Sequence, residues 1–242
     1  GVPPEFYTKA KKQGLYILDA TCPLVRKVHL EAIRYAKLGY TILYIGHKGH
    51  DEAVGVLAEA PDSMILVDNL DDAAKVKPQQ QEKLIYLTQT TLSVNETSEI
   101  IKVLKQRFPS LQDPPKEDIC YATTNRQLAV RSLAKNCDLV LVLGSQNSSN
   151  SLRLKECAEE EGAQAFLIDS YVEFDESWLD GVETIGITAG ASAPEQLVKE
   201  LLQFLKEEYN IESSSEQDII KENMFFPVPN LKKQKEHQAL EN

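Results

Sequence analysis

The chain has 242 residues with a formal net charge of −11, and 42% of its residues are hydrophobic. The negative charge argues against non-specific binding to nucleic acid or to an anionic membrane, and no apolar run approaches the ~18 residues of a membrane span. Four cysteines are too few for a secreted disulfide scaffold, so they indicate a reducing, cytoplasmic compartment, with a plastid as the alternative. Because the chain begins at Gly1 and not at Met, we expect an N-terminal portion to be missing from it.

The hydrophobic pattern predicts strands that alternate with helices. Strands are expected at residues 15–19, 40–45, 64–67, 84–87, 139–143, 165–168, 184–187 and 224–228. Helices are expected at residues 25–38, 71–75, 93–108, 124–136, 148–161 and 194–209. Residues 108–118 resemble a linker, and the last dozen residues are expected to be disordered. Strands separated by helices predict parallel sheets, and therefore an α/β fold.

The chain also repeats itself, and each copy begins at a cysteine. Cys22 is followed 24 residues later by Gly46, and Cys120 is followed 24 residues later by Gly144. Apolar strand segments match between the copies at nearly the same offset. A repeat of about 100 residues has the size of a domain, so we predict two similar α/β domains in tandem.

Polar segments follow the predicted strands. In open α/β sheets, ligands bind at the carboxyl ends of the strands. Almost all of the residues at those ends carry small hydroxyl, amide, imidazole or glycine groups; the segments are residues 19–22, 46–50, 88–91, 144–150 and 188–192. Any one of these loops alone is better explained by helix capping. Five together favour a crevice that binds an oxyanion through neutral donors and helix N-termini. The nucleotide-binding motifs GxGxxG and GxxxxGK[ST] are absent from the sequence.

Cys22 and Cys120 lie near predicted helix N-termini, where the helix dipole favours the thiolate. Thiolates are the ligands of soft metals and of iron–sulfur clusters. Cys137 and Cys157 have no counterpart in the other copy and are interpreted as buried packing residues. Two thiolates do not complete a cluster, so a third cysteine is expected in the missing N-terminal part.

The segment His50-Asp51-Glu52 brings an imidazole and carboxylates into one loop. A glutamate beside a redox site can deliver protons, although a solvated acidic loop is the commoner explanation of such a pair. His29 lies within a predicted helix and is interpreted as structural.

Six motifs together resemble the family of 4-hydroxy-3-methylbut-2-enyl diphosphate reductases, the last enzymes of the non-mevalonate isoprenoid route. They are DATCPLVRKVH (19–29), IGHKGHDE (45–52), LTQTTLSV (87–94), DICYATTNRQ (118–127), LGSQNSSNS (143–151) and TAGASAP (188–194). They occur in the family's order and cover most of residues 15–205. The segment 222–229 is similar to the family's final strand.

The resemblance implies three similar α/β domains in a pseudo-threefold trefoil around a [4Fe-4S] cluster held by three cysteines. Residues 1–22 would then be the remnant of the first domain, 23–116 the second and 117–205 the third, with the tail 206–242 returning to the first. Cys22 and Cys120 would be two of the cluster ligands.

The resemblance also implies roles for individual side chains. Glu52 would deliver a proton, and the allylic diphosphate would be contacted by His50, Thr90, Ser148, Ser149, Asn150 and Ser192. The expected products are isopentenyl and dimethylallyl diphosphate, and the expected electron donor is ferredoxin or flavodoxin.

Two other functions remain open from the sequence. A metal-free α/β module that binds a phosphorylated metabolite would need the polar loops but would leave the paired cysteines unexplained. A thiol redox protein would need Cys22 and Cys120 within disulfide reach, with Cα atoms roughly 4.4–6.8 Å apart.

Overall fold

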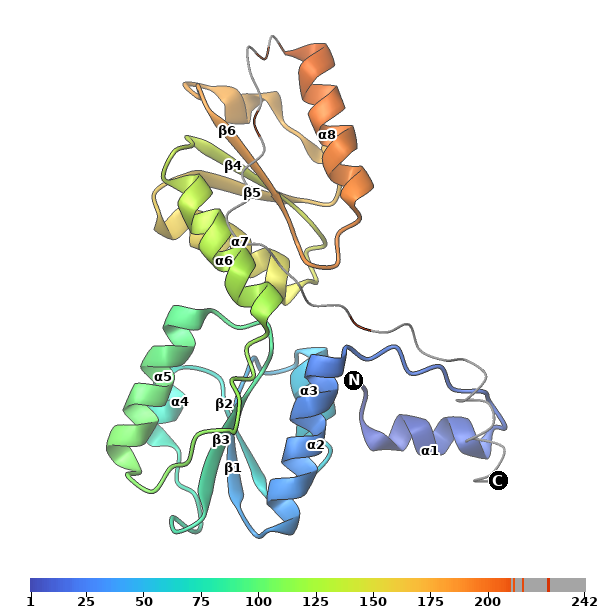
Figure 1. The fold of residues 1–242 in the computed structure, drawn as a ribbon, viewed down its shortest axis with the longest axis vertical. Helices are drawn as coiled ribbons and strands as arrows, with labels where there is room; N and C mark the ends of the chain where they lie inside the picture. Colours follow the sequence, from blue (N-terminus) through green and yellow to red (C-terminus); the bar gives the residue numbers. More distant parts are fainter. Residues whose placement is uncertain (210, 212–214, 216–225, 227–242) are drawn as a thin grey trace. The chain divides into compact units, whose positions relative to one another are not determined.

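The computed structural model describes residues 1–209, 211, 215 and 226, and its chain divides into two compact units (Figure 1). Unit 1 contains residues 1–90 and 94–119, and unit 2 contains residues 91–93 and 120–209. Apart from Phe226, the strand expected at residues 224–228 lies outside the described residues, as does the disorder expected of the last dozen. So does nearly all of the expected tail, whose first residues instead end the last helix.

Unit 1 is built on a parallel three-stranded sheet in the order β2-β1-β3. Its strands are β1 (Thr41–Ile45), β2 (Met64–Val67) and β3 (Leu84–Thr88), and its core helices are α2 (Pro23–Lys37), α3 (Asp51–Leu57), α4 (Leu70–Lys75) and α5 (Val94–Arg107). Helices α2 and α3 cover one face of the sheet, and α4 and α5 cover the other (Figure 1). Because both faces are covered, β1 and β3 are almost continuously apolar and buried.

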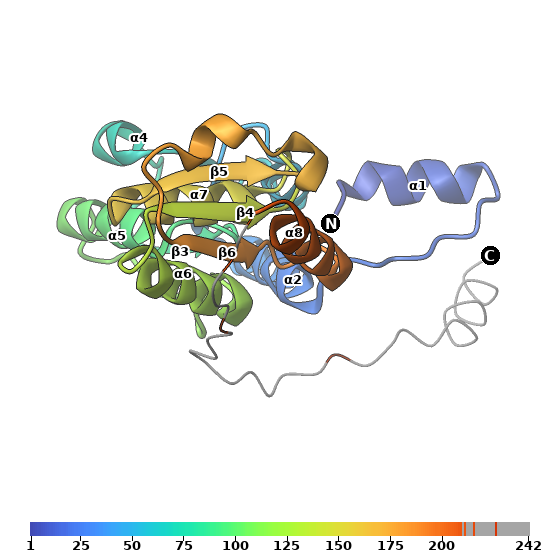
Figure 2. The same cartoon turned by 90° about the horizontal axis from the view of Figure 1, so that it is seen from above.

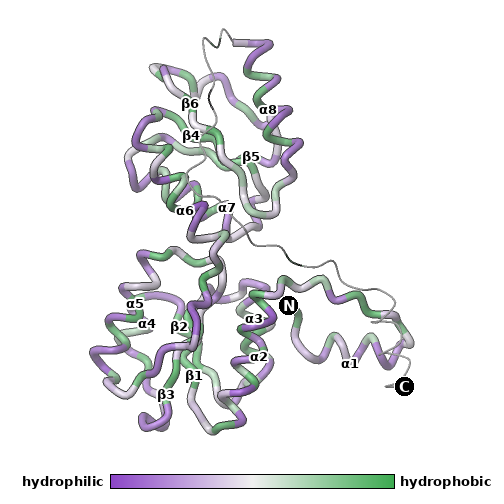
Figure 3. Tube along the Cα trace, in the orientation of Figure 1, coloured by the Kyte–Doolittle hydropathy of each residue, from purple (hydrophilic) through white to green (hydrophobic). Residues whose placement is uncertain are grey.

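Helical spacing explains how α2 packs on this sheet. Val28 and Ala32 are four residues apart, so they lie on the same face of the helix, and both are fully buried against Ile42 and Tyr44 of β1. In Figure 3 the apolar stretches coincide with the strands, while the helices alternate between apolar and polar positions. Pro23 occupies the first turn of α2, so the helix begins two residues before the predicted start.

Unit 2 repeats the plan, with a parallel sheet in the order β5-β4-β6. Its elements are α6 (Tyr121–Ala134), β4 (Leu139–Leu143), α7 (Ser149–Glu160), β5 (Gln164–Ile168), two short 3-10 turns, β6 (Ile185–Ala189) and α8 (Glu195–Glu208). Helices α6 and α7 pack on Val140 and Val142, and α8 packs on the opposite face of the sheet. The predicted α/β fold with parallel sheets is therefore confirmed, and its two copies share one strand order. None of the helices in the described part of the chain is both long and apolar enough to cross a membrane.

The strand predicted at residues 15–19 was wrong. Residues 15–19 form no strand, because no described strand pairs with them, and Leu15 and Leu18 are exposed. A helix that the pattern did not predict, α1 (Pro4–Lys12), precedes them and buries none of its own residues. In Figure 2, α1 and the extended segment that follows it run alongside each other.

Candidate functional site

The carboxyl end of the unit 1 sheet holds Glu52 against Thr90. Oε1 of Glu52 accepts a hydrogen bond from the Thr90 N–H at 2.7 Å, and Oε2 accepts one from the Thr90 hydroxyl at 2.9 Å. Glu52 is buried at the start of α3, and Thr90 is buried just after β3. Burial raises the pKa of Glu52 above its ordinary value, although both hydrogen bonds from Thr90 act to lower it. Glu52 is therefore more readily protonated than a solvated glutamate, as a proton donor near neutral pH must be.

His50 caps the same short helix, and its ring orientation follows from that role. Its Nδ1 accepts a hydrogen bond from the Glu52 N–H at 3.2 Å. Burial lowers the pKa of His50, and the charge of Asp51 only partly opposes this shift. A neutral imidazole whose Nδ1 accepts must carry its proton on Nε2, so His50 has an N–H donor to offer to a ligand.

Gln89 organises this loop, and the sequence analysis assigned it no role. Its side chain is completely buried, and its Oε1 accepts a hydrogen bond from the His47 N–H at 3.0 Å. A Cβ at Gly46 would come within 2.7 Å of the Tyr44 ring and 3.2 Å of Gln89 Oε1, so glycine permits this close packing. The sequence feature that could have identified Gln89 is a long amide side chain placed directly after a buried strand.

Cys22 and Cys120 each occupy the residue just before a helix. Cys22 is exposed and precedes α2, where its side chain makes no capping hydrogen bond. Cys120 is partly buried and precedes α6, and its Sγ accepts a hydrogen bond from the Thr123 N–H at 3.3 Å. This contact explains why α6 begins at Tyr121, three residues earlier than predicted.

These two thiols fit the chemistry of an iron–sulfur site. Both are free, and each occupies the N-cap position of a helix. Cys157 is buried in the core of unit 2, and Cys137 is only partly buried and packs against that core. Within the described residues, no three His, Cys, Asp or Glu side chains gather as a complete metal site.

The N-terminus of α7 in unit 2 carries three of the predicted diphosphate contacts. Ser148 caps the helix, with its Oγ accepting from the Ser151 N–H at 3.3 Å. Ser149 is buried, and its hydroxyl accepts a hydrogen bond from the Thr91 hydroxyl at 3.1 Å. Asn150 is 5% exposed, yet its amide nitrogen and oxygen are both buried without a hydrogen-bond partner. Unpartnered buried amide groups are rare because desolvation costs about 1–3 kcal/mol, so Asn150 leaves an unmet hydrogen-bonding demand at this helix N-terminus.

The loop after β6 lies beside Asn150. A Cβ at Gly190 would come within 3.6 Å of the Asn150 amide nitrogen and would clash with the Ser151 hydroxyl. Ser192 follows in the same loop and is exposed. Arg126, which the sequence analysis missed, donates from its guanidinium to the Ala189 carbonyl at 3.1 Å. It therefore brings a positive charge to a loop that was predicted to contain only neutral donors.

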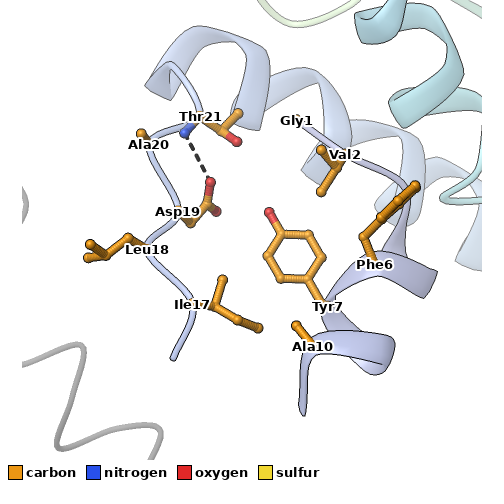
Figure 4. Close-up of a pocket in the computed structure, with 10 residues that line it drawn as sticks. All are labelled: Gly1, Val2, Phe6, Tyr7, Ala10, Ile17, Leu18, Asp19, Ala20 and Thr21. Atoms are coloured by element: carbon orange, nitrogen blue, oxygen red, sulfur yellow. Dashed lines mark hydrogen bonds between the residues drawn. The ribbon is translucent and has the colours of Figure 1, made fainter. Parts of the chain in front are cut away.

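A cavity of about 410 Å³ lies elsewhere in unit 1, between α1 and residues 17–21 (Figure 4). Figure 4 shows the Tyr7 hydroxyl directed toward Asp19, whose Oδ1 accepts from the Thr21 N–H at 2.9 Å. Burial and the Asp19 charge raise the pKa of Tyr7. Most of the residues that line this cavity are apolar, and the only lining residues with a predicted part in ligand binding are those of the segment 19–22, which was expected to follow a strand and follows none here.

The predicted residues thus form two groups, each within one unit. Unit 1 holds Cys22, His50, Glu52 and Thr90, and unit 2 holds the others, which are Cys120, Ser148, Ser149, Asn150 and Ser192.

Comparison with known proteins extends these observations. The family model described as LytB protein matches residues 1–206. The 4-hydroxy-3-methylbut-2-enyl diphosphate reductase of Mycobacterium ulcerans is 55% identical over 208 residues, which are 86% of this chain and 63% of the relative. The protein of the same name from Rhodopirellula baltica is 49% identical over 230 residues, covering 95% of this chain and 72% of the relative. The chain thus spans about 63% of the length of the first of these relatives.

Solved structures agree with the sequence comparison. The E-1-hydroxy-2-methyl-but-2-enyl-4-diphosphate reductase from Plasmodium falciparum matches with a TM-score of 0.91 and 37% identity, covering 100% of this chain and 75% of that one. A second structure, described as (E)-4-hydroxy-3-methyl-but-2-enyl diphosphate reductase, matches with a TM-score of 0.56 and 30% identity, covering 86% of this chain and 73% of that one. From these matches and from the motifs at the strand ends, the chain belongs to the LytB protein family.

Proposed function

We propose that this chain forms most of a reductase that removes the allylic hydroxyl of 4-hydroxy-3-methylbut-2-enyl diphosphate. The names of its relatives support this substrate. The structural observation that carries the proposal is the buried, unpartnered amide of Asn150 at the N-terminus of α7. A diphosphate oxygen placed there would accept a hydrogen bond from that amide and would also benefit from the positive end of the helix dipole.

The reaction consumes two electrons and two protons, replaces the C–OH bond with a C–H bond and releases water. Isopentenyl and dimethylallyl diphosphate are the two products, which differ in the carbon that receives the new proton. A [4Fe-4S] cluster would supply the electrons when bound, and Cys22 and Cys120 would be two of its ligands. Ferredoxin or flavodoxin, as the chemical source of single electrons, would reduce it.

Glu52 would supply a proton to the departing hydroxyl. Burial raises its pKa, which makes the protonated form more accessible than in a solvated glutamate, and its two hydrogen bonds from Thr90 hold the carboxyl group in one orientation. His50 would donate from Nε2 to a phosphate oxygen. Ser148, Ser149, Asn150 and Ser192 would hold the diphosphate from unit 2, while Thr90 would lie near the substrate.

Iron and sulfide analysis after anaerobic purification tests the proposal. The protein would be a version extended to the length of the curated relatives, assayed with the allylic diphosphate and a chemical reductant. Cys22→Ser and Cys120→Ser should each lose most of the bound iron and the activity. The matched control Cys137→Ser removes a cysteine that packs on the core and should retain both. Diphosphate binding without iron or turnover would contradict the proposal and would favour a metal-free binding module.

A further inference from the structure

Residues 111–118 lie along the outer edge of β3 in unit 1. Gln112 forms a parallel bridge with Ile85, accepting from the Tyr86 N–H at 3.3 Å and donating to the Leu84 carbonyl at 2.9 Å. The next amide along this edge of β3 is that of Thr88, and it donates to Oδ2 of Asp118 at 2.9 Å. The Asp118 carboxylate thus continues the pairing of this edge strand beyond the point where backbone pairing ends.

The same carboxylate is held from the other side by α2. The Lys27 ammonium donates to Oδ1 of Asp118 at 2.8 Å, to the Lys116 carbonyl at 2.7 Å and to the Glu117 carbonyl at 3.3 Å. Three donors of one ammonium therefore bind three consecutive residues, and the same ammonium lies 3.6 Å from Oε2 of Glu31 on α2. Asp118 is only 4% exposed, so this ion pair is shielded from water far more than the surface pairs of the chain.

The three segments that Asp118 joins each lead directly to a residue of the proposed site. Helix α2 begins just after Cys22, and Cys22 lies five residues before Lys27. Strand β3 ends at Thr88, two residues before Thr90. The segment that contains Asp118 continues through Ile119 to Cys120, which caps α6.

We propose that Asp118 and Lys27 form a clamp that positions Cys120 as a cluster ligand. This proposal rests on the proposed function. The clamp fixes the backbone two residues before the thiol, which restricts the conformations of the segment that leads into Cys120. Metal ligands need support of this kind, because a displacement of about 0.5 Å already impairs a site. Asp118 is a positioning residue, since its carboxylate is engaged by Lys27 and Thr88 and is not free to bind a ligand.

Hydrogen exchange tests the clamp without any cofactor. The amides of Thr123 and Thr124 donate to Sγ and to the carbonyl of Cys120, so their exchange reports the geometry around that residue. Asp118→Asn and Lys27→Met should each speed the exchange of these two amides by roughly tenfold or more in protein that is still folded. Should either single variant fail to fold, the double variant decides the question, because it removes both charges of the Lys27–Asp118 pair together and leaves only Glu31, 3.6 Å from Lys27, without that cation.

The matched control is Asp113→Asn in the same linker. Asp113 also contacts a lysine, Lys105, and the Tyr86 hydroxyl, but it is exposed. This control should leave the Thr123 and Thr124 amides unchanged. Unchanged exchange in the folded clamp variants, or an equal effect of Asp113→Asn, would overturn the proposal.

A second measurement separates this proposal from the proposed function. In the iron-loaded, extended protein, Asp118→Asn and Lys27→Met should release iron to a chelator about tenfold faster than the Asp113→Asn control. Equal release rates would contradict the clamp's role in ligand positioning. If the unmodified protein binds no iron, the proposed function fails, while the exchange rates still decide whether the clamp orders Cys120.

Discussion

Thr90 binds both carboxylate oxygens of Glu52, one through its backbone N–H at 2.7 Å and the other through its hydroxyl at 2.9 Å. The two residues are 38 positions apart in the sequence. They meet because α3 begins, and β3 ends, at the same edge of the sheet. The pair fixes the orientation of a buried acid at the carboxyl edge of a parallel sheet, which is where α/β proteins bind their ligands.

Replacing Glu52 with glutamine should slow turnover while the diphosphate still binds. The glutamine side chain would keep the shape and a carbonyl acceptor for Thr90, but it cannot donate the proton that the leaving hydroxyl needs. General acid catalysis contributes about 10²–10⁴-fold, so steady-state turnover should fall by a factor in that range. The measurement is turnover of the extended protein, together with its cluster absorption spectrum.

Asp51→Asn is the control for that change. Asp51 is the exposed neighbour of Glu52 on the same helix, so its variant should keep near-normal turnover. Normal turnover of Glu52→Gln would remove this residue from the mechanism. Loss of the cluster spectrum in Glu52→Gln would make the residue structural.

The same substitution should raise stability at neutral pH. Burial raises the pKa of Glu52 in the folded state above the pKa that the same residue has in the unfolded chain. At pH values near and between these two pKa values, the folded state therefore binds more protons than the unfolded state. The contribution of protonated Glu52 to the free energy of unfolding is therefore fully present at low pH and is lost as pH rises through the folded-state pKa. Glutamine does not ionise and suffers no such loss. Denaturant unfolding from about pH 4 to about pH 7 should show the variant gaining stability over the unmodified chain as pH rises. A difference that shrinks with rising pH would contradict the raised pKa.

Asn150→Ala should weaken diphosphate binding. The loss of a hydrogen bond to a charged group costs about 1.5–3 kcal/mol, which corresponds to a roughly 10- to 150-fold weaker affinity. Calorimetry with the allylic diphosphate measures this directly. Asn147→Ala, an exposed position of the same loop, is the control and should bind normally. Equal affinities for both variants would exclude Asn150 from the binding site.

Gly190→Ala should destabilise unit 2 because its new methyl group would meet the Ser151 hydroxyl. Overpacking of this kind costs about 1–3 kcal/mol, measurable as a lower free energy of unfolding. Adding Ser151→Ala removes the obstructing oxygen and leaves the Ser151 Cβ at 3.4 Å and the Asn150 amide nitrogen at 3.6 Å, which are ordinary contact distances, so the double variant should recover most of the loss. A double variant no more stable than Gly190→Ala would place the strain elsewhere.

Much of the fold could be predicted because apolar runs and helical spacing are local properties. Strands β1, β2 and β4 were predicted within one residue, and their largely buried positions are the reason for their unbroken apolar pattern. The strand predicted at residues 15–19 failed because strand formation also needs a neighbouring strand, which is not a local property of the sequence. A short apolar run looks the same whether or not a neighbouring strand exists, and no described strand pairs with this one.

The sequence by itself determined the parallel α/β class, the repeat that begins at Cys22 and Cys120, and the polar residues at the strand ends, since each of these is written in residue order. Tertiary structure alone decided which polar atoms are satisfied. It gave Glu52 both hydrogen bonds of Thr90, left the amide of Asn150 buried without a partner and set Lys27 on Asp118. These facts depend on distances between residues far apart in the chain, and burial in the folded units gives such contacts their energetic weight.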